Sequence, residues 1–340
     1  MTADIGDPLG APPPDPALGR VFRGGAWLAS ASLVGAVLLV AQGIITTRVL
    51  GPAGLGIIAI VVAVVMVTRL LLSFRMSEVV VRFVAPLADA DAGRAAAWLA
   101  LAALVEAGSA LAAWLLIVAA GPAVAMLFVS PEYAALVLLY AVVIPAGVVS
   151  ETALGVLQAY RRFDLQALAQ LVERVVTLAA VVIVAAQNGG IAAFVLASTT
   201  GPVIGGMLLT ALAWLVAARR VGPPLLAPRL SLVSGERREA LRFALATNAA
   251  GSLSMVAKDA DPLWLGWLRT PAEAGLYRLA YSVGSLLFLP AAPLSQTVYP
   301  EAAQLVGAGR GDALRRLVAR ASRPVAVFAG LLLVLSVLFG

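Results

Sequence analysis

No cysteine and no histidine occur among the 340 residues of this chain. Without thiols the chain can form neither disulfide bonds nor thiolate metal sites, and without imidazole it lacks the side chain that most often serves as a general base. Charge is also scarce, since 12% of the residues are charged whereas 61% are hydrophobic, and soluble domains carry about 25% charged residues. The composition therefore excludes most enzyme classes and predicts an integral membrane protein, with no cofactor and no metal ion expected.

What the sequence has in excess is long uncharged runs. Residues 24–47 and 175–218 carry no charge, and a helix needs roughly 20 residues to cross the hydrocarbon core of a bilayer. The second run is therefore expected to hold two spans, with a turn at residues 187–190. Over the whole chain we predict an all-α, polytopic transmembrane helical bundle of about nine helices, at residues 22–45, 53–74, 95–119, 133–157, 167–187, 190–217, 240–260, 272–293 and 318–339.

The basic residues predict how these helices are oriented. Of the 24 Lys and Arg residues, 20 fall in segments that this helix pattern places on one side of the membrane, and the positive-inside rule makes that side cytoplasmic, with the N-terminus inside. The net charge of +6 is spread over short clusters between apolar spans instead of forming one patch. This distribution favours the lipid bilayer as the environment and argues against a nucleic-acid partner.

Pro-rich and charged stretches divide the chain. Residues 1–19 are expected to be a disordered cytoplasmic tail, 20–219 a six-helix N-terminal half, and 220–239 a cytoplasmic linker. Residues 240–340 are expected to hold the first three helices of a second, pseudo-repeated half, which is thus incomplete. Between the second and third helices, Glu78 and Arg82 stand four residues apart among apolar residues, which predicts a short amphipathic helix in the inner interface with that pair on one face.

One short motif occurs twice. Pro52 and Gly56 are separated by three residues, and the same spacing returns at Pro271 and Gly275. In each copy an apolar helix precedes the motif and another follows it, and proline suits the first position of a helix because its missing N–H would have no partner there. We predict an outer-side hinge that is present once in each half.

Polar residues inside predicted spans are functional candidates because they are costly in lipid. The helix predicted at 240–260 carries a polar stripe with Asn248 and Asp259 beside it, made of Thr247, Gly251, Ser254, Lys258 and Asp261. Such a face must contact protein or water. It predicts either one wall of a hydrated substrate cavity or a local pair in which Lys258 and Asp261 neutralise each other.

Further charged residues occur in other spans. Glu106, near the middle of the third helix, is a candidate for proton coupling together with Asp259, or else for pairing with an arginine of another helix. Arg48 could contact an anionic ligand or extend to the lipid headgroups. Arg278 adds to a polar face one helix away from the stripe, and the adjacent Glu173 and Arg174 are interpreted mainly as an interfacial charge pair.

Three motifs together resemble the oligosaccharide flippases, which share a superfamily with the multidrug and toxin extruders and the lipid II flippase. They are Arg48-x-Leu-Gly-Pro-x-x-x-Gly56, the inner Gln158-Ala-Tyr-Arg-Arg-Phe163, and residues 261–266 leading to the second hinge motif. The resemblance runs from about residue 20 to the end of the chain. Members of the family usually have twelve to fourteen helices.

The resemblance implies a V-shaped pair of six-helix bundles around a cationic cavity in a bacterial inner membrane. It implies alternating access that moves a polyprenyl-diphosphate-linked oligosaccharide from the inner to the outer leaflet, for surface polysaccharide assembly and with assembly proteins as further partners. The substrate-pathway candidates are then Arg48, Asn248, Lys258, Asp261 and Arg278.

Three alternatives stay open beside the flippase. The chain could be a multidrug and toxin cation antiporter of the same superfamily, or a truncated remnant that transports nothing. A membrane glycosyltransferase or glycan polymerase is disfavoured because the predicted outer loops are short, roughly 4 to 14 residues. The sequence offers no nucleotide-binding motif, so an ion gradient or the substrate gradient would have to supply the energy.

Overall fold

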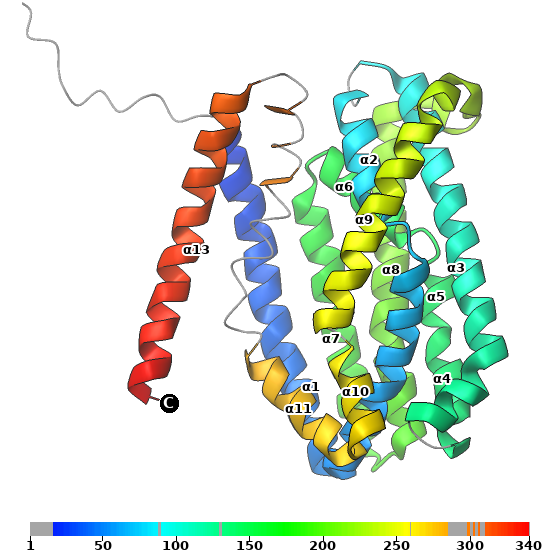
Figure 1. The fold of residues 1–340 in the computed structure, drawn as a ribbon, viewed down its shortest axis with the longest axis vertical. Coiled ribbons are helices and arrows are strands. Elements are labelled where there is room, and N and C mark those ends of the chain that lie inside the picture. The colour runs from blue at the N-terminus through cyan, green and yellow to red at the C-terminus, as the bar shows by residue number, and fades with distance from the viewer. Residues whose placement is uncertain are drawn as a thin grey trace, which may run out of the picture.

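The computed structural model describes residues 16–87, 90–128, 131–258, 260–284, 298–299, 302, 305–306 and 310–339. Within these residues the chain folds as a bundle of long helices (Figure 1). The main elements are α1 (Pro16–Leu72), α2 (Met76–Val84), α3 (Ala92–Phe128), α4 (Ala134–Ala141), α5 (Val143–Ala146), α6 (Ser150–Ala159), α7 (Phe163–Ala186), α8 (Ile191–Val221), α9 (Arg237–Lys258), α10 (Asp261–Leu268), α11 (Pro271–Gly284) and α13 (Gly311–Phe339).

Five described segments are long and apolar enough to cross a membrane: Gly25–Leu87, Ala92–Gly121, Pro131–Ala159, Phe163–Ala186 and Ile191–Val221. The first is long because α1 contains the first two predicted helices, which meet at a kink at Gly51. These segments confirm the predicted polytopic transmembrane helical bundle, since each exceeds the roughly 20 residues that a span requires.

In the described part of the chain, four short 3₁₀ helices connect the long ones. They are η1 (Ala85–Leu87), η2 (Pro131–Tyr133), η3 (Pro223–Leu225) and η4 (Leu230–Glu236). Between α8 and α9 the chain turns at Gly222, whose φ of 70° lies in the left-handed region, and the prolines that follow cannot continue a helix. Below, the end of the bundle that carries the Gly51 kink is called the turn end, and the end that carries η3 and η4 the linker end.

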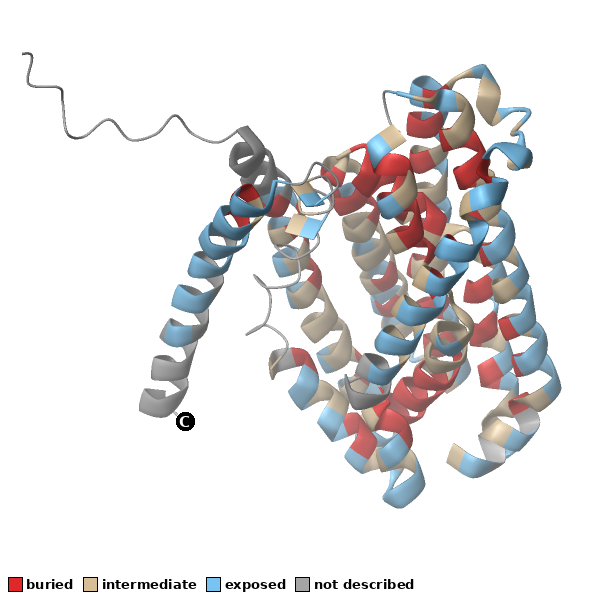
Figure 2. Ribbon diagram, turned by 45° about the horizontal axis from the view of Figure 1, so that its top comes forward, coloured by how far each residue is buried: buried red, intermediate tan, exposed pale blue. Residues whose placement is uncertain are grey.

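The two largest apolar cores among the described residues hold the bundle together. The first core packs the second part of α1 against α3, α4 and α8, with Ile60 and Phe194 fully buried in it. The second core packs α2, α3, α6 and α8 around Trp98 near the linker end. Figure 2 shows the buried residues gathered in the middle of this bundle, whereas the described side chains of α13 are mostly exposed.

Most predicted helix positions agree with the structure, but three details differ. Residues 16–19, predicted as tail, already belong to α1, and residues 1–15 lie outside the described residues. The helix predicted at 133–157 is broken into α4, α5 and α6. The helix predicted at 240–260 ends at Lys258, so Asp261 starts a separate helix, α10, and is not on one continuous stripe with Lys258. Residues 285–293, at the end of the eighth predicted helix, also lie outside the description.

The short amphipathic helix predicted near residues 75–90 corresponds to α2, which carries Glu78 and Arg82 on one face, although each side chain pairs with a different residue. Glu78 contacts Arg75, with 2.6 Å between Oε1 and Nε, and Arg82 contacts Glu239 of α9 at 2.8 Å. The reason is that Arg75 adopts a left-handed backbone conformation just before α2, so its side chain reaches Glu78 and leaves Arg82 for the neighbouring helix.

Candidate functional site

A cavity of about 650 Å³ lies inside the bundle, between both parts of α1, the broken helix α4–α6, α7, α8, α10 and α11. Apolar residues form much of its wall. Its polar lining is a mixed set of charged and neutral side chains: Gln42, Thr46, Arg69, Ser73, Tyr140, Ser150, Glu151, Gln166, Gln170, Glu173, Arg174, Thr177, Ser198, Arg278 and Ser282. A space of this size within membrane-spanning helices can hold the polar part of a ligand while the apolar bundle faces lipid.

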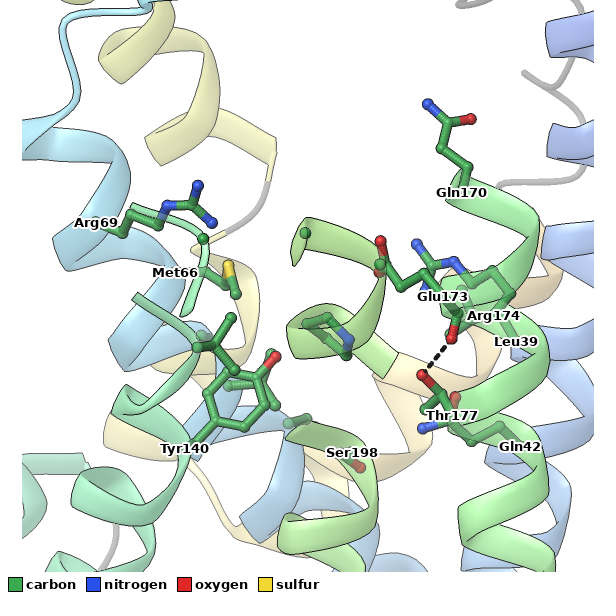
Figure 3. Close-up of a pocket in the computed structure, with 18 of the residues that line it drawn as sticks. Leu39, Gln42, Met66, Arg69, Tyr140, Gln170, Glu173, Arg174, Thr177 and Ser198 are labelled. Atoms are coloured by element: carbon green, nitrogen blue, oxygen red, sulfur yellow. Dashed lines mark hydrogen bonds between the residues drawn. The ribbon is translucent and has the colours of Figure 1, made fainter. Parts of the chain in front are cut away.

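Three arginines from three different helices line the cavity. Arg69 comes from the second part of α1, Arg174 from α7 and Arg278 from α11, and all three are half-buried. Arg69 Nη2 donates a 2.6 Å hydrogen bond to Ser150 Oγ at the start of α6. Figure 3 shows Arg69 and Tyr140 on one side of the space, and Gln170 and Glu173 of α7 on the other. Guanidinium groups in this position are costly in a membrane, which makes the cavity the candidate functional site.

Two carboxylates share the cavity wall with these arginines. Glu151 accepts a 2.6 Å hydrogen bond from Ser77 Oγ of α2, while Glu173 lies on α7 one turn before Thr177. The Thr177 hydroxyl donates to the Glu173 backbone carbonyl at 2.8 Å, the bond drawn in Figure 3. With three arginines and two glutamates among the lining residues, the formal charge of the wall is net positive by one.

Close packing of α7 on α8 sets the position of Glu173. A Cβ atom added to Gly201 would lie 1.8 Å from Thr177 Oγ1, and one added to Gly205 would lie 2.6 Å from Glu173 Cβ. Glycine at these two positions therefore lets the two helix backbones approach each other, as small residues do between membrane helices. A larger residue at Gly205 would push Glu173 into the cavity.

The break between α5 and α6 lies at the cavity wall. Backbone N–H groups at the start of a helix have no partner in their own helix, and in a membrane each unsatisfied group costs several kcal/mol. Here the carboxylate of Glu106 on α3 accepts the N–H of Glu151 and the N–H of Thr152, both at 2.7 Å. Glu106 is buried, with 6% of its surface exposed, and its carboxylate contacts the α6 backbone instead of an arginine of another helix.

The two predicted hinge motifs pack directly against each other at the turn end. A Cβ atom on Gly56 would lie 1.6 Å from the carbonyl oxygen of Pro271, and one on Gly275 would lie 2.1 Å from that of Pro52. The contact is thus reciprocal: the glycine of each motif meets the proline of the other. Just before the first motif, Gly51 has φ 73° and ψ 174°, a backbone region that is open essentially to glycine alone.

The structure brings one of the predicted substrate-pathway residues, Arg278, to the cavity wall. Arg48 is exposed and lies outside the lining. Asp261 accepts a hydrogen bond from the Tyr277 hydroxyl near the turn end. Asn248 contacts the carbonyl of Leu71 at 3.5 Å, at the end of α1.

Two further candidates are not placed by the structure. Lys258 is the last residue of α9, but its side chain is outside the description, and Asp259 lies outside the described residues altogether. Among the residues that the structure does describe, no group of three or more acidic side chains is arranged to hold a metal ion.

Sequence reasoning missed Arg69, and it interpreted Glu173 and Arg174 mainly as an interfacial pair. All three line the cavity. A signal was present for Arg69, which stands directly before three leucines and after a valine and a threonine, so it belongs to an apolar span and not to a loop. The sequence offers no comparable signal that Glu173 faces the cavity, because its position depends on close packing against the glycines of α8.

Salt bridges tie the first helices to α9 at the linker end. Arg82 pairs with Glu239 and also lies over the ring of Phe243, with 4.5 Å from its Cζ to the ring centroid. Arg94 of α3 pairs with Glu236 at the end of η4. These contacts hold the start of α9 against α2 and α3.

Solved transporter structures share this arrangement of long helices. A MATE multidrug transporter, DinF-BH, superposes with a TM-score of 0.70 at 16% identity, over 91% of this chain and 70% of that chain. A Vibrio cholerae MATE transporter gives 0.70 at 15% identity over 96% and 75%. A MOP superfamily transporter from Pyrococcus furiosus gives 0.64 at 15% identity over 92% and 72%.

At these identities the likeness shows the fold alone, a bundle of long helices shared with these multi-pass transporters. The family model for polysaccharide biosynthesis proteins matches residues 21–306, and the chain belongs to that family. A search of curated proteins gave no match. The family resemblance predicted from the hinge and loop motifs is thereby confirmed.

Proposed function

We propose that this protein moves a polyprenyl-diphosphate-linked oligosaccharide from the inner to the outer leaflet of a bacterial inner membrane, by alternating access and for surface polysaccharide assembly. The proposal places the N-terminus and the linker end in the cytoplasm, because arginines concentrate there at the end of α8, between η3 and η4, and at the start of α9. It treats residues 220–239 as the link between two pseudo-repeated halves, and polysaccharide assembly proteins as further partners.

The observation that carries the proposal is the convergence of Arg69, Arg174 and Arg278 on one intramembrane cavity. A guanidinium group presents a planar fork of donors that matches a phosphate group with two parallel hydrogen bonds. A diphosphate carries several acceptor oxygens, so it can engage guanidinium groups from more than one wall. The net positive wall also favours an anionic ligand over a cationic one.

Neutral polar residues beside the arginines suit the glycan. Gln42 and Gln170 are half-buried in the lining, and the amide of each can both donate and accept. Thr177 and Ser198 add hydroxyl groups to the lining. Sugar hydroxyls need partners of this kind, whereas the polyprenyl chain can remain in lipid.

The test is binding of undecaprenyl diphosphate to the purified protein in detergent micelles. We expect saturable binding that weakens about 10- to 100-fold in Arg278→Gln, because hydrogen bonds to charged groups contribute about 1.5–3 kcal/mol each. Arg48→Gln is the matched control, since Arg48 is exposed and outside the cavity lining, and it should bind as the wild type does.

A second candidate, cation and drug antiport, is favoured by Glu173 in the cavity wall and by the MATE-type fold. A lipophilic cationic dye should be tested on the same preparation. Saturable dye binding that is lost in Glu173→Gln, with no binding of the diphosphate lipid, would replace the flippase proposal by the antiporter.

A further inference from the structure

The one carboxylate at the centre of a described span that does not line the cavity is Glu106. It lies midway along the candidate span Ala92–Gly121 of α3, and it is buried. Both of its carboxylate oxygens are used by backbone N–H groups of α6, at 2.7 Å each. Its role must therefore be sought in what those bonds hold in place.

Glu106 completes the hydrogen bonding of the α6 N-terminus. Of the first four N–H groups of α6, that of Ser150 donates to the carbonyl of Gly147 at 3.2 Å and that of Ala153 to the carbonyl of Val149 at 2.9 Å. The two between them, of Glu151 and Thr152, donate to Glu106. The carboxylate also lies where the helix dipole favours negative charge. All four N–H groups at the break therefore have hydrogen-bond partners only with Glu106 in place.

The residues at this helix start are cavity residues. Gly147, Ser150 and Glu151 all belong to the lining. The Ser150 hydroxyl oxygen accepts the 2.6 Å bond from Arg69 Nη2, and the Glu151 carboxylate accepts the 2.6 Å bond from Ser77. A shift of the first turn of α6 would move the partner of Arg69 and so the direction in which its guanidinium group points.

We propose that Glu106 is a positioning residue of the cavity, which fixes the start of α6 so that Ser150 orients Arg69 toward the ligand. Glu106 itself touches no ligand. For the ligand, this inference rests on the proposed function, since Arg69 is one of the three arginines expected to hold the diphosphate. The geometry of α6 can be tested independently of any ligand.

The ligand-free test uses the absence of natural cysteine. Leu154 lines the cavity one turn after Ser150 and is half-buried, so Leu154→Cys gives a single thiol on the same face of α6. We expect Glu106→Gln to change the rate at which a water-soluble maleimide labels this thiol by about tenfold, because an amide offers one acceptor oxygen and places donors against the second N–H. Glu132→Gln removes an exposed carboxylate and is the control that should leave labelling unchanged.

The ligand test is a double-mutant cycle with undecaprenyl diphosphate. Glu106→Gln should weaken binding about tenfold in the wild-type background, from the cost of an unsatisfied buried donor. It should have a clearly smaller effect when Ser150→Ala has already removed the partner of Arg69. General destabilisation of the bundle would lower affinity by the same factor in both backgrounds and would overturn the inference.

The outcomes separate the two proposals. If the wild type binds no diphosphate lipid but Glu106→Gln alters the labelling of the Leu154→Cys thiol, the proposed function fails and the role of Glu106 in holding α6 survives. If the wild type binds the lipid and Glu106→Gln leaves both labelling and affinity unchanged while altering only the pH dependence of transport, then Glu106 is a proton-coupling group and the positioning role is refuted.

Discussion

Replacing Gly56 by alanine tests whether the two hinge motifs depend on their direct contact. The added Cβ would lie 1.6 Å from the Pro271 carbonyl oxygen, whereas real Cβ atoms essentially never come within 3.0 Å of such an atom. The two turns must therefore separate by about 1.4 Å. Because the obstructing atom belongs to the backbone, no side-chain rotation relieves the clash.

The expected cost follows from two opposing effects. Overpacking costs about 1–3 kcal/mol, and more where backbone has to move, while alanine in place of a helical glycine gains up to about 1 kcal/mol. Gly108 provides the reference, because it is helical and has nothing within 4 Å of an added Cβ. Because both positions are helical, the gain cancels in the comparison, and Gly56→Ala should be less stable than Gly108→Ala by the overpacking cost of about 1–3 kcal/mol or more.

The assay is denaturant unfolding in micelles, combined with a distance measurement at the turn end. Val49 and Leu276 are exposed on α1 and α11, and a chain without cysteine accepts spin labels at these two positions alone. The label-to-label distance should lengthen in Gly56→Ala and stay unchanged in Gly108→Ala. Equal stability of the two variants with an unchanged distance would refute the packing argument.

The reciprocal contact supplies an internal repetition of the same experiment. Gly275→Ala places a Cβ 2.1 Å from the Pro52 carbonyl oxygen, so it should separate the same two turns. Once one substitution has separated them, the second meets less resistance, and the double variant should lose less stability than the sum of the two single losses. Full additivity would mean that the motifs respond separately and do not form one contact.

Three further substitutions test the kink and the linker end. Gly51→Ala should destabilise the protein by about 1–3 kcal/mol, measured by the same unfolding assay, because φ 73° and ψ 174° are closed to alanine; an unchanged midpoint would contradict the backbone argument. Glu239→Gln should cost less than about 1 kcal/mol, since the pair is 44% and 61% exposed. Arg82→Ala should cost about 0.5–1 kcal/mol more because it also loses the contact with the Phe243 ring, and equal effects would show that the ring contact contributes nothing.

The helices could be predicted from the sequence because each depends on its own composition. An uncharged run of sufficient length indicates a span in any surroundings, and proline and glycine indicate where it ends. The Gly51 turn and its repeat near Pro271 were found for the same reason. Which side chains face the cavity was predictable only in part. Both Arg278 and Arg48 were predicted to lie on the substrate pathway, but Arg278 lies at the cavity wall whereas Arg48 is exposed.

What could not be predicted are the contacts between distant segments. Pro145 and Gly147 stand at the break between α5 and α6, but nothing in residues 133–157 indicates that Glu106, about 45 residues earlier in the chain, stabilises it. Similarly, the pairing of Arg82 with Glu239 joins residues 157 positions apart. For Arg82 the local spacing offered Glu78 as a partner, and for residues 133–157 it offered one continuous helix. In both cases a contact with a distant segment determines the observed structure.

The two irregular points of the bundle illustrate one rule about membrane helices. Interrupted backbone is tolerated in a bilayer only where protein or a cavity supplies the missing contacts. At the turn end, glycine at positions 56 and 275 lets one turn pack on the carbonyl of the other. At the start of α6, a buried carboxylate accepts hydrogen bonds from the two N–H groups that have no partner within the helix. Because each interruption borders elements that line the cavity, a substitution that fails to satisfy either one should alter the cavity before it unfolds the bundle.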